Sequence, residues 1–385
     1  MEIVIFTILT LLSLPYLVVV TLLAFILIKQ KHLNVDHSSK DVATDSLEVS
    51  IIIAARNESK NIRRLVESLA QQNYPKEKFE IILVDDHSDD ETAFIAEREF
   101  RKTDLSFSLL RIENDSVVTG KRAALSVGVE SARFNLFLFT DADVFLPPNW
   151  IRTMLGSLTI DCHLVAGPVI IRSKSSFFSR LEETEYISVS AMTAAFGLAG
   201  RSVMANGANM LVRKESYMNA LSMGYQKGYP SGDDMFLVEF LRRNYGNQAM
   251  VFCGKYDAIV SCDSSESLGA FVSQRLRWAG KARGYRDRYI LLVGLMTFAF
   301  NAIVACSPFL IMITPAFLWL FCLLIMLRAL SEGLLIWNWS SLTRQKNLFP
   351  YYFVLLPLYP YYVLFIGAVS AFIKPKWKGR NLSCF

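Results

Sequence analysis

Two aspartates, one residue apart, stand where they could bind a metal ion. Asp141 and Asp143 follow the apolar run 136–139, which is typical of a strand buried on both faces of a sheet. In an open α/β sheet the carboxyl end of such a strand faces the ligand crevice. Carboxylates there can hold Mg²⁺ or Mn²⁺, and the ion would bridge the phosphates of a substrate. A simple turn also favours aspartate at this position. The choice between a metal site and a turn therefore depends on the other motifs of the chain.

Polar residues also follow the other predicted strands. Strands are predicted over 49–53, 80–84 and 107–112, with helical patterns between them, and this alternation indicates βαβ units on a mostly parallel sheet. One sheet edge then gathers Ala54, Ala55, Glu58, Asp86, Lys121 and Asp141. A carboxylate such as Asp86 can accept a hydrogen bond from a nucleotide base, and Lys121 can pair with phosphate. Alternatively, the acidic run 85–90 is a helix cap that favours the helix dipole.

A third acidic pair opens a predicted helix. Asp233 and Asp234 precede the helical pattern over 235–243, where a carboxylate is favoured by the helix dipole alone. The functional interpretation is a general base, which must lie within hydrogen-bond reach of an acceptor hydroxyl.

A basic segment, residues 271–289, leads to the later apolar runs. It contains Gln274, Arg275, Arg277 and Trp278. One interpretation is an amphipathic helix on anionic headgroups, with Trp278 as an interfacial anchor. In the other interpretation, the side chains of Gln274, Arg277 and Trp278 face the active site. The two interpretations are compatible with each other.

The composition indicates a membrane protein with a soluble domain between its spans. The chain has 385 residues, 52% of them hydrophobic, and its apolar runs at 3–28, 290–313, 314–337 and 348–373 are long enough to be membrane spans. Glu2 and the missing cleavage site argue against a signal peptide. Lys29 and Lys31 follow the first run, so the positive-inside rule predicts a multi-pass protein of the cell (inner or plasma) membrane with a cytosolic catalytic domain.

The basic tail 374–385 conflicts with that topology. With three later spans the tail would face outward, against the positive-inside rule. Pro357 and Pro360 lie in the last run, so it could be a re-entrant hairpin; otherwise one of the earlier runs does not cross. Arg328 and Glu332 could pair on one helix face, and we expect them at the cytosolic end of a span, where burying charge costs less.

Several site classes are excluded. The six cysteines form no Cys-X-X-Cys pair, and the four histidines do not cluster with them, so neither a zinc site nor a disulfide framework is indicated. No basic tract interleaved with aromatic residues suggests nucleic acid. The expected organisation is an anchor at 1–28, a linker at 29–47, an α/β domain at 48–270, the basic helix 271–289, about three membrane segments at 290–373 and a basic tail at 374–385.

Taken together, these motifs resemble the family 2 glycosyltransferases, the membrane-anchored inverting enzymes with a GT-A fold. The resemblance covers about residues 49–284 in the order of the family. Its motifs are the opening strand and loop 49–58, Val84 to Ser88, Gly120-Lys121, Thr140 to Asp143, Gly232 to Asp234 and the complete Gln-X-X-Arg-Trp at 274–278. The chain departs from the family at Ala54 and Arg56, which stand where Pro and Tyr are usual, and at Asp233, which replaces Glu.

The resemblance implies roles for the residues. Ala54, Ala55, Glu58, Asp86, Lys121 and Asp141 would contact the nucleotide-sugar, with Asp86 on the uracil ring. Asp141 and Asp143 would hold the Mg²⁺ or Mn²⁺ ion that neutralises the leaving diphosphate. Asp234, supported by Asp233, would deprotonate the acceptor, and one displacement would invert the anomeric configuration. Gln274, Arg275, Arg277 and Trp278 would form the acceptor and diphosphate side of the site.

Three functions stay open from the sequence. The preferred one is transfer from a UDP-sugar to a lipid-linked or saccharide acceptor in cell-envelope polysaccharide or glycolipid synthesis, because three later spans are few for a polymer pore. The intact Gln-X-X-Arg-Trp motif favours a processive polysaccharide synthase. A catalytically inactive nucleotide-sugar sensor, acting on partners through its membrane helices, belongs to a different class; the acidic residues of every motif argue against it.

Overall fold

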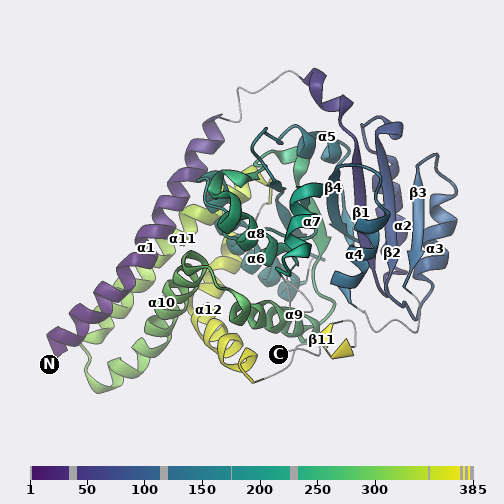
Figure 1. Ribbon diagram of the computed structural model, residues 1–385. Coiled ribbons are helices and arrows are strands. Elements are labelled where there is room, and N and C mark those ends of the chain that lie inside the picture. Colours follow the sequence, from purple (N-terminus) through teal and green to yellow (C-terminus); the bar gives the residue numbers. More distant parts are fainter. Residues whose placement is uncertain are drawn as a thin grey trace. The chain divides into compact units, whose positions relative to one another are not determined.

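The chain forms two compact units, each built from separate stretches of sequence. The computed structural model describes residues 2–33, 41–112, 120–174, 176–225, 233–345, 347–372, 376–377 and 380–381. The helical unit comprises Met1–Val35, Ser173–Ala199 and Ser264–Lys376, and the sheet unit comprises Asp36–Arg172, Gly200–Asp263 and Trp377–Phe385. Figure 1 labels many of the elements of both units.

A seven-stranded sheet forms the centre of the sheet unit. Its order is β3-β2-β1-β4-β8-β6-β9. The bounds are β1 Val49–Ala55, β2 Phe79–Asp85, β3 Phe107–Arg111, β4 Leu136–Asp141, β6 Leu164–Ala166, β8 Met210–Arg213 and β9 Met250–Phe252. Strand β8 runs antiparallel to β4 and β6, whereas β1, β2, β3 and β4 are parallel. The expected mostly parallel α/β sheet is confirmed.

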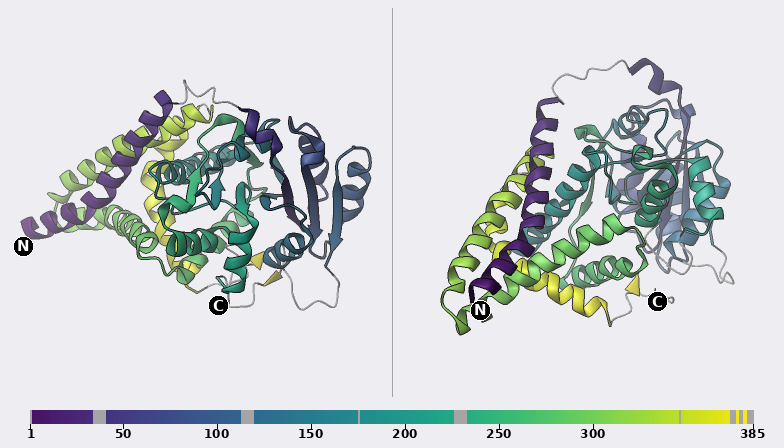
Figure 2. Two further views of the ribbon diagram at one scale, coloured as in Figure 1. Left: turned by 45° about the horizontal axis from the view of Figure 1, so that its top comes forward. Right: turned by 60° about the vertical axis from the view of Figure 1, so that its left-hand side comes forward.

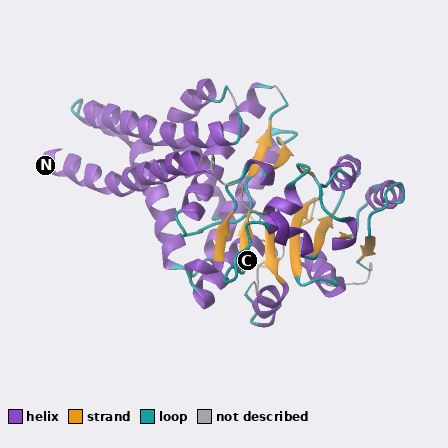
Figure 3. Ribbon diagram, turned by 90° about the horizontal axis from the view of Figure 1, so that it is seen from above, coloured by secondary structure: helices purple, strands orange, loops and turns teal. Residues whose placement is uncertain are grey.

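The inner strands form because their residues are apolar on both faces. Every residue of β2 is buried, and β1 and β4 each have one partly exposed residue. β-Branched and aromatic side chains suit such a fully covered strand. Figure 3 shows the strands lying between helices.

The helices of this unit alternate with the strands. They are α2 Ile62–Ala70, α3 Thr92–Phe100, α4 Lys121–Ser131, α5 Trp150–Leu155, α7 Lys214–Ser222 and α8 Asp233–Tyr245. Helix α4 packs on β1 and β2. Gly128 allows this close approach, because a β-carbon there would lie 2.6 Å from Ile52 Cγ2.

Short elements complete the sheet unit. A second sheet has the order β5-β10-β7, with bounds β5 Val144–Phe145, β10 Val260–Asp263 and β7 Val169–Arg172. Four 3₁₀ turns are η1 Asp41–Ser46, η2 Lys76–Lys78, η3 Asn247–Ala249 and η4 Tyr256–Ala258. The strands β11 Lys376–Trp377 and β12 Arg380–Asn381 pair near the chain end.

The helical unit consists of long helices packed side by side. Its elements are α1 Glu2–Leu33, α6 Phe177–Leu198, α9 Leu268–Gly280, η5 Lys281–Gly284, α10 Arg288–Ile313, α11 Phe317–Leu342 and α12 Phe349–Ser370. Helix α1 runs along α11, although the two are far apart in sequence (Figure 2). Helix α6 packs on α1, α11 and α12, and α9 packs on α12.

Four helices in the described part of the chain are long and apolar enough to cross a membrane. They are Val4–Gln30, Arg288–Ile313, Phe317–Leu342 and Phe349–Ser370. The sequence expectation of one anchor and three later segments matches this set. The apolar side chains exposed along these helices, such as Leu11, Leu295 and Trp319, are the surface that a bilayer would cover.

Three local expectations differ from the structure. The last apolar run is one continuous helix, α12, with Pro357 and Pro360 inside it, and not a hairpin. Arg328 and Glu332 do pair, at 2.9 Å, but near the middle of α11 rather than at its end. Their charges are satisfied there by each other and by Tyr16 of α1, 2.6 Å from Glu332. The segment 271–289, expected to be one helix, contains most of α9, then η5, then the first residues of α10.

Candidate active site

Strand register brings several predicted residues to one sheet edge. Ala54 of β1 lies beside Asp141 of β4 on one side and Val84 of β2 on the other, and Ala55 lies beside Asp85. Because parallel strands end at the same edge, the loops that follow them meet there. The structure therefore assembles the first, second and fourth predicted motifs around the ends of three neighbouring strands.

Asp86 is completely buried at the end of β2. Its main-chain N–H donates to Ala55 O at 2.8 Å. Its Oδ2 accepts a hydrogen bond from Gly120 N at 3.0 Å, and its Oδ1 lies 2.9 Å from His87 Nδ1. Asp86 thus connects the end of β2 with the start of α4. Gly120 has a φ of 100°, a conformation that a residue without a β-carbon adopts without strain.

Arg56 organises the loops after β1 and β2. Its guanidinium is buried, with Nη1 donating to Asp86 O at 2.7 Å and His87 O at 2.5 Å, and Nη2 donating to Asp89 Oδ2 at 3.1 Å. Sequence reasoning noticed Arg56 only as a departure from the family. The sequence does carry one signal for this role: Arg56 is a long, positively charged side chain directly after a buried strand, from where it can reach the neighbouring loop.

Glu58 lies at the start of α2 and is also buried. Its Oε2 accepts from Asn61 Nδ2 at 2.7 Å, and its main-chain N–H donates to Thr92 Oγ1 at 2.7 Å. These bonds fix the loop after β1 against the start of α3.

Lys121 and Asp141 form an ion pair at the edge of the sheet. Lys121 is the first residue of α4, so its Nζ stands at the positive end of a helix. The two side chains are 22% and 31% exposed. A pair this open to solvent contributes about 0–1 kcal/mol, so a substrate that replaces one partner need not overcome a large stabilisation.

Asp143 is held through its main chain by Arg64, which the sequence analysis did not single out. Arg64 of α2 donates from Nη2 to Asp143 O at 2.9 Å and pairs through Nη1 with Asp263 of β10 at 2.8 Å. This clamp places the Asp-X-Asp segment relative to α2. Within the described ranges, no group of three or more His, Cys, Asp or Glu residues is arranged to hold a metal ion.

Asp234 reaches the same site from α8. Its Oδ2 accepts a hydrogen bond from Gly207 N at 3.2 Å, and its Oδ1 accepts from Met235 N at 2.8 Å. A β-carbon at Gly207 would lie 3.4 Å from Lys121 Nζ and 3.8 Å from Asp234 Oδ2. Gly207 is therefore close both to the cation that pairs with Asp141 and to the predicted base. The side chain of Asp233 lies outside the described part of the chain.

Asn209 holds the Gly207 loop in place, and sequence reasoning missed it. This fully buried amide donates to Pro168 O at 2.9 Å and Ala258 O at 2.8 Å, and it accepts from Trp150 Nε1 at 2.9 Å. Its neighbour Ala208 accepts from Thr140 Oγ1 at 2.9 Å, which connects the loop to β4. Only the fold reveals this role, because the partners are distant in sequence.

The Gln-X-X-Arg-Trp residues lie on α9 of the helical unit. Arg275 is buried and donates from Nη2 to Glu185 Oε2 of α6 at 2.6 Å, and its Nη1 donates to Gln274 Oε1. Trp278 has the Arg275 guanidinium 4.4 Å from its ring centroid. Arg277 and Trp278 are partly exposed. Burial alone would lower the pKa of Arg275, but the charge of Glu185 and its hydrogen bond give a net rise above the ordinary value.

Comparison with known proteins decides the family. The family described as "Glycosyl transferase family group 2" matches residues 136–368, more than half of the chain, and "Glycosyl transferase family 2" matches residues 50–220. The chain belongs to glycosyltransferase family 2. The resemblance predicted from the sequence motifs is thereby confirmed.

This family 2 glycosyltransferase is similar to poly-beta-1,6-N-acetyl-D-glucosamine synthases of two Staphylococcus species. It is 28% identical over 245 residues to the poly-beta-1,6-N-acetyl-D-glucosamine synthase of Staphylococcus aureus (strain COL), covering 62% of this chain and 56% of that protein. For the Staphylococcus epidermidis synthase the identity is 27% over 237 residues, covering 60% and 53%. The matched stretch thus spans just over half the length of these relatives.

A solved structure supports the fold. The mannosyltransferase from Pyrobaculum calidifontis in complex with GDP-Man and Mn²⁺ superposes with a TM-score of 0.52 at 17% identity, covering 94% of this chain and 99% of that one. At this identity the likeness concerns the fold alone. It agrees with the GT-A fold class expected for this glycosyltransferase.

Proposed function

We propose that this membrane glycosyltransferase moves a sugar from a nucleotide-sugar, a UDP-sugar by expectation, to a hydroxyl of a saccharide or lipid-linked acceptor. The observation that carries the proposal is the position of Gly207. Lys121, which pairs with Asp141, and Asp234 both come within 4 Å of the point that a β-carbon at Gly207 would occupy. A diphosphate binder and a base side by side are what displacement at an anomeric carbon requires.

The donor diphosphate would lie over Lys121 and the start of α4. The positive end of the helix and the ammonium group both favour phosphate. The carboxylates of Asp141 and Asp143 supply hard oxygen ligands, which suit Mg²⁺ or Mn²⁺. The bound ion would neutralise charge on the leaving diphosphate. Since Lys121 already pairs with Asp141, arrival of the donor would let the lysine turn from the carboxylate to phosphate.

The nucleotide base would meet the loop after β2. Asp86 Oδ2 accepts a hydrogen bond from Gly120 N at 3.0 Å, and Oδ1 lies 2.9 Å from His87 Nδ1. An ionised carboxylate is an acceptor through both oxygens, so Asp86 would accept a hydrogen bond from a base N–H. Ala54, Ala55 and Glu58 would contribute from the neighbouring loop after β1.

Asp234 would remove the proton from the attacking hydroxyl. Its Oδ2 accepts a hydrogen bond from the Gly207 N–H at 3.2 Å, which orients the carboxylate. The hydroxyl oxygen would attack the anomeric carbon from the face opposite the diphosphate, and the C–O bond to the diphosphate would break. One displacement of this kind inverts the configuration, with Asp233 in a supporting role.

The acceptor side would include Gln274, Arg277 and Trp278 beside the membrane, the indole offering an apolar face to a sugar ring. The names of the Staphylococcus relatives favour one specific version, in which UDP-N-acetylglucosamine is the donor and the product is a polysaccharide. The four apolar helices suit a multi-pass protein of the cell membrane, with the sheet unit on the cytosolic side by the charge rule.

A donor panel tests the proposal. The protein in lipid nanodiscs is incubated with Mg²⁺ or Mn²⁺ and with UDP-GlcNAc, UDP-glucose, UDP-galactose or GDP-mannose, and nucleotide release is measured beside mass spectrometry of the products. We expect release with a UDP-sugar and a product carrying that sugar, as a ladder if synthesis is processive. Tight UDP-sugar binding without release or product from any lipid or saccharide acceptor would contradict an enzymatic role and favour a sensor.

A further inference from the structure

Three acidic residues on one turn of α6 are nearly inaccessible to solvent, and the proposed chemistry uses none of them. Glu182, Glu183 and Glu185 have exposed fractions of 2%, 5% and 6%. Burying a carboxylate is unfavourable unless an opposite charge and hydrogen bonds compensate for the lost water. Their partners therefore indicate what this turn is for.

Each carboxylate binds a different element of the helical unit. Glu182 accepts from the main-chain N–H and the hydroxyl of Ser265, at 2.8 and 2.7 Å, just before α9. Glu183 accepts from Gln345 Nε2 at 2.9 Å, just after α11. The acidic turn of α6, residues 182–185, thus joins the beginning of α9 to the end of a membrane helix.

Glu185 forms the central contact, with Arg275 of the Gln-X-X-Arg-Trp motif. It accepts from Arg275 Nη2 at 2.6 Å and from the Tyr362 hydroxyl of α12 at 3.3 Å. Arg275 is only 3% exposed, and a second carboxylate, Glu182, lies 4.0 Å away. A guanidinium that is buried, and whose three nitrogens all donate to side chains of the protein, lacks the exposure of a group that awaits a substrate.

Arg275 also stacks on the motif tryptophan. Its guanidinium lies 4.5 Å from the ring centroid of Phe271 and 4.4 Å from that of Trp278. Tyr186, next to the acidic turn, lies against Trp278 with ring centroids 6.0 Å apart. The orientation of the indole is therefore set by Arg275 and by α6.

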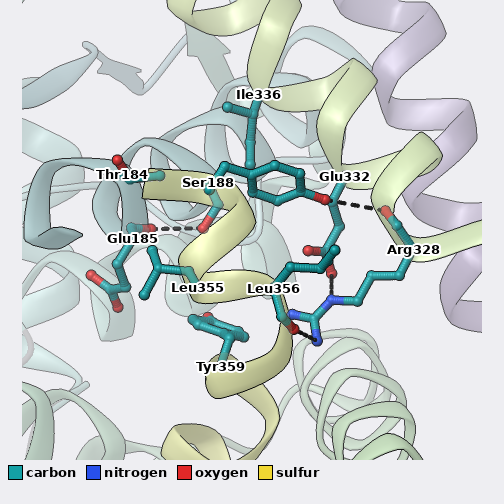
Figure 4. A pocket seen from close by; sticks show the side chains of 10 residues that line it. Thr184, Glu185, Ser188, Arg328, Glu332, Ile336, Leu355, Leu356 and Tyr359 are labelled. Atoms are coloured by element: carbon teal, nitrogen blue, oxygen red, sulfur yellow. Dashed lines mark hydrogen bonds and ion pairs between the residues drawn. The ribbon is translucent and has the colours of Figure 1, made fainter. Parts of the chain in front are cut away.

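Little space remains around this contact for water to replace a lost partner. A cavity beside it is lined by Glu185 and Ser188 of α6, Arg328 and Glu332 of α11, and Tyr359 of α12 (Figure 4). The cavity has a volume of about 20 Å³, which is room for about one water. Removing either charge of the Arg275–Glu185 pair would leave the other with at most about one water from this cavity to compensate it.

We infer that Arg275 is a positioning residue, which together with Glu185 and Tyr362 fixes the motif helix α9 and its Trp278 on the membrane helix α12. The partly exposed Arg277 and Trp278 remain as the motif residues that contact the acceptor. This inference rests on the proposed function, because it assigns a role within that reaction.

Three variants test it: Arg275→Lys, Glu185→Gln and Tyr362→Phe, in nanodiscs, with Tyr361→Phe as the matched control. Tyr361 is the next residue of α12 and is 46% exposed. Lysine keeps the charge of Arg275 but not the planar fork. We expect Arg275→Lys and Glu185→Gln to lower kcat by roughly 10–100-fold, the effect of a small misplacement of a reacting group, with the Kd for the donor unchanged. Tyr362→Phe should act in the same direction but less strongly.

Hydrogen exchange supplies a readout that does not depend on turnover. All three variants should speed amide exchange in residues 268–280 and leave residues 233–245 unchanged, whereas Arg277→Gln should lower activity without changing exchange in α9. If Arg275→Lys is inactive while Glu185→Gln and Tyr362→Phe keep wild-type kcat and exchange, Arg275 contacts substrate directly and the inference is wrong. Faster exchange of α9 in a protein that turns over no nucleotide-sugar would instead refute the proposed function alone.

Discussion

At the scale of single residues, the site separates proton transfer from donor binding. Asp234→Asn keeps the size of the side chain and an oxygen for the Gly207 N–H, but it cannot take a proton near neutral pH. A general base contributes about 10²–10⁴-fold to the chemical step. We therefore expect turnover to fall by roughly that factor while the Kd for the UDP-sugar, measured by calorimetry, stays the same.

Asp233→Asn is the matched control, and it should reduce turnover less, since its proposed role is support. If Asp233→Asn is inactive while Asp234→Asn is active, the general base is Asp233 and not Asp234. Normal rates in both variants would place the base elsewhere.

The metal prediction concerns Asp141 and Asp143. Asp143→Asn removes one anionic ligand, and excess EDTA removes the ion, so each should abolish sugar transfer. Activity lost to EDTA should return on adding Mg²⁺ or Mn²⁺. The exposed carboxylate Asp161 offers a control, because Asp161→Asn should leave the metal titration unchanged. Full activity of the wild type in EDTA would rule out this assignment.

The nucleotide prediction concerns Asp86. Asp86→Ala should weaken UDP binding by about 1–3 kcal/mol, the cost of leaving a buried hydrogen-bond partner unsatisfied. Part of this loss would come through Gly120, whose N–H donates to Asp86 in the structure. Asp104→Ala removes an exposed carboxylate that pairs with Lys76 and should not change UDP affinity. Unchanged affinity in a folded Asp86→Ala protein would mean that Asp86 serves only to connect the loops.

At the scale of elements, the contact of α4 with the sheet positions Lys121. A β-carbon at Gly128 would lie 2.6 Å from Ile52 Cγ2 and 3.3 Å from Val84 Cγ2, so Gly128→Ala must push the helix or the strands apart. Overpacking of this kind costs about 1–3 kcal/mol. We expect a lower melting temperature by differential scanning fluorimetry, together with weaker donor binding. Gly294→Ala, where a β-carbon meets nothing within 4 Å, is the control; an equal effect of both variants would contradict the packing argument.

At the scale of the whole molecule, one buried charge pair joins the first membrane helix to a much later one. Tyr16 of α1 donates to Glu332 at 2.6 Å, and Glu332 pairs with Arg328, which is 1% exposed. Removing one partner of a buried ion pair costs about 3–5 kcal/mol, whereas replacing the whole set by apolar residues is often neutral or stabilising. Glu332→Leu should therefore lower thermal stability in detergent, and the triple variant Tyr16→Phe/Arg328→Met/Glu332→Leu should recover most of the loss. A triple variant less stable than Glu332→Leu would show that the charges stabilise the bundle.

The sequence by itself determined the features that depend on neighbouring residues. The periodicity of apolar residues predicted the alternating strands and helices, and four long apolar runs predicted the membrane helices. Both signals are contained within short, continuous stretches of sequence. The order of motifs was sufficient for the family and the GT-A fold. It also placed Asp86, Lys121 and Asp141 at one edge, since parallel strands end together. The pairing of Arg328 with Glu332 followed from their spacing of one helical turn.

Only the tertiary structure decided which residues meet across long stretches of chain. Gly207 comes to lie close to both Lys121 and Asp234, and Asn209 is held by Trp150, Pro168 and Ala258. The motif arginine Arg275 is buried against Glu185, which lies 90 residues earlier. Such contacts depend on how helices and strands pack, and packing is set by side-chain volumes summed over the whole core. A local pattern carries no information about those sums, so a buried positioning arginine and a substrate-binding arginine look alike in the sequence.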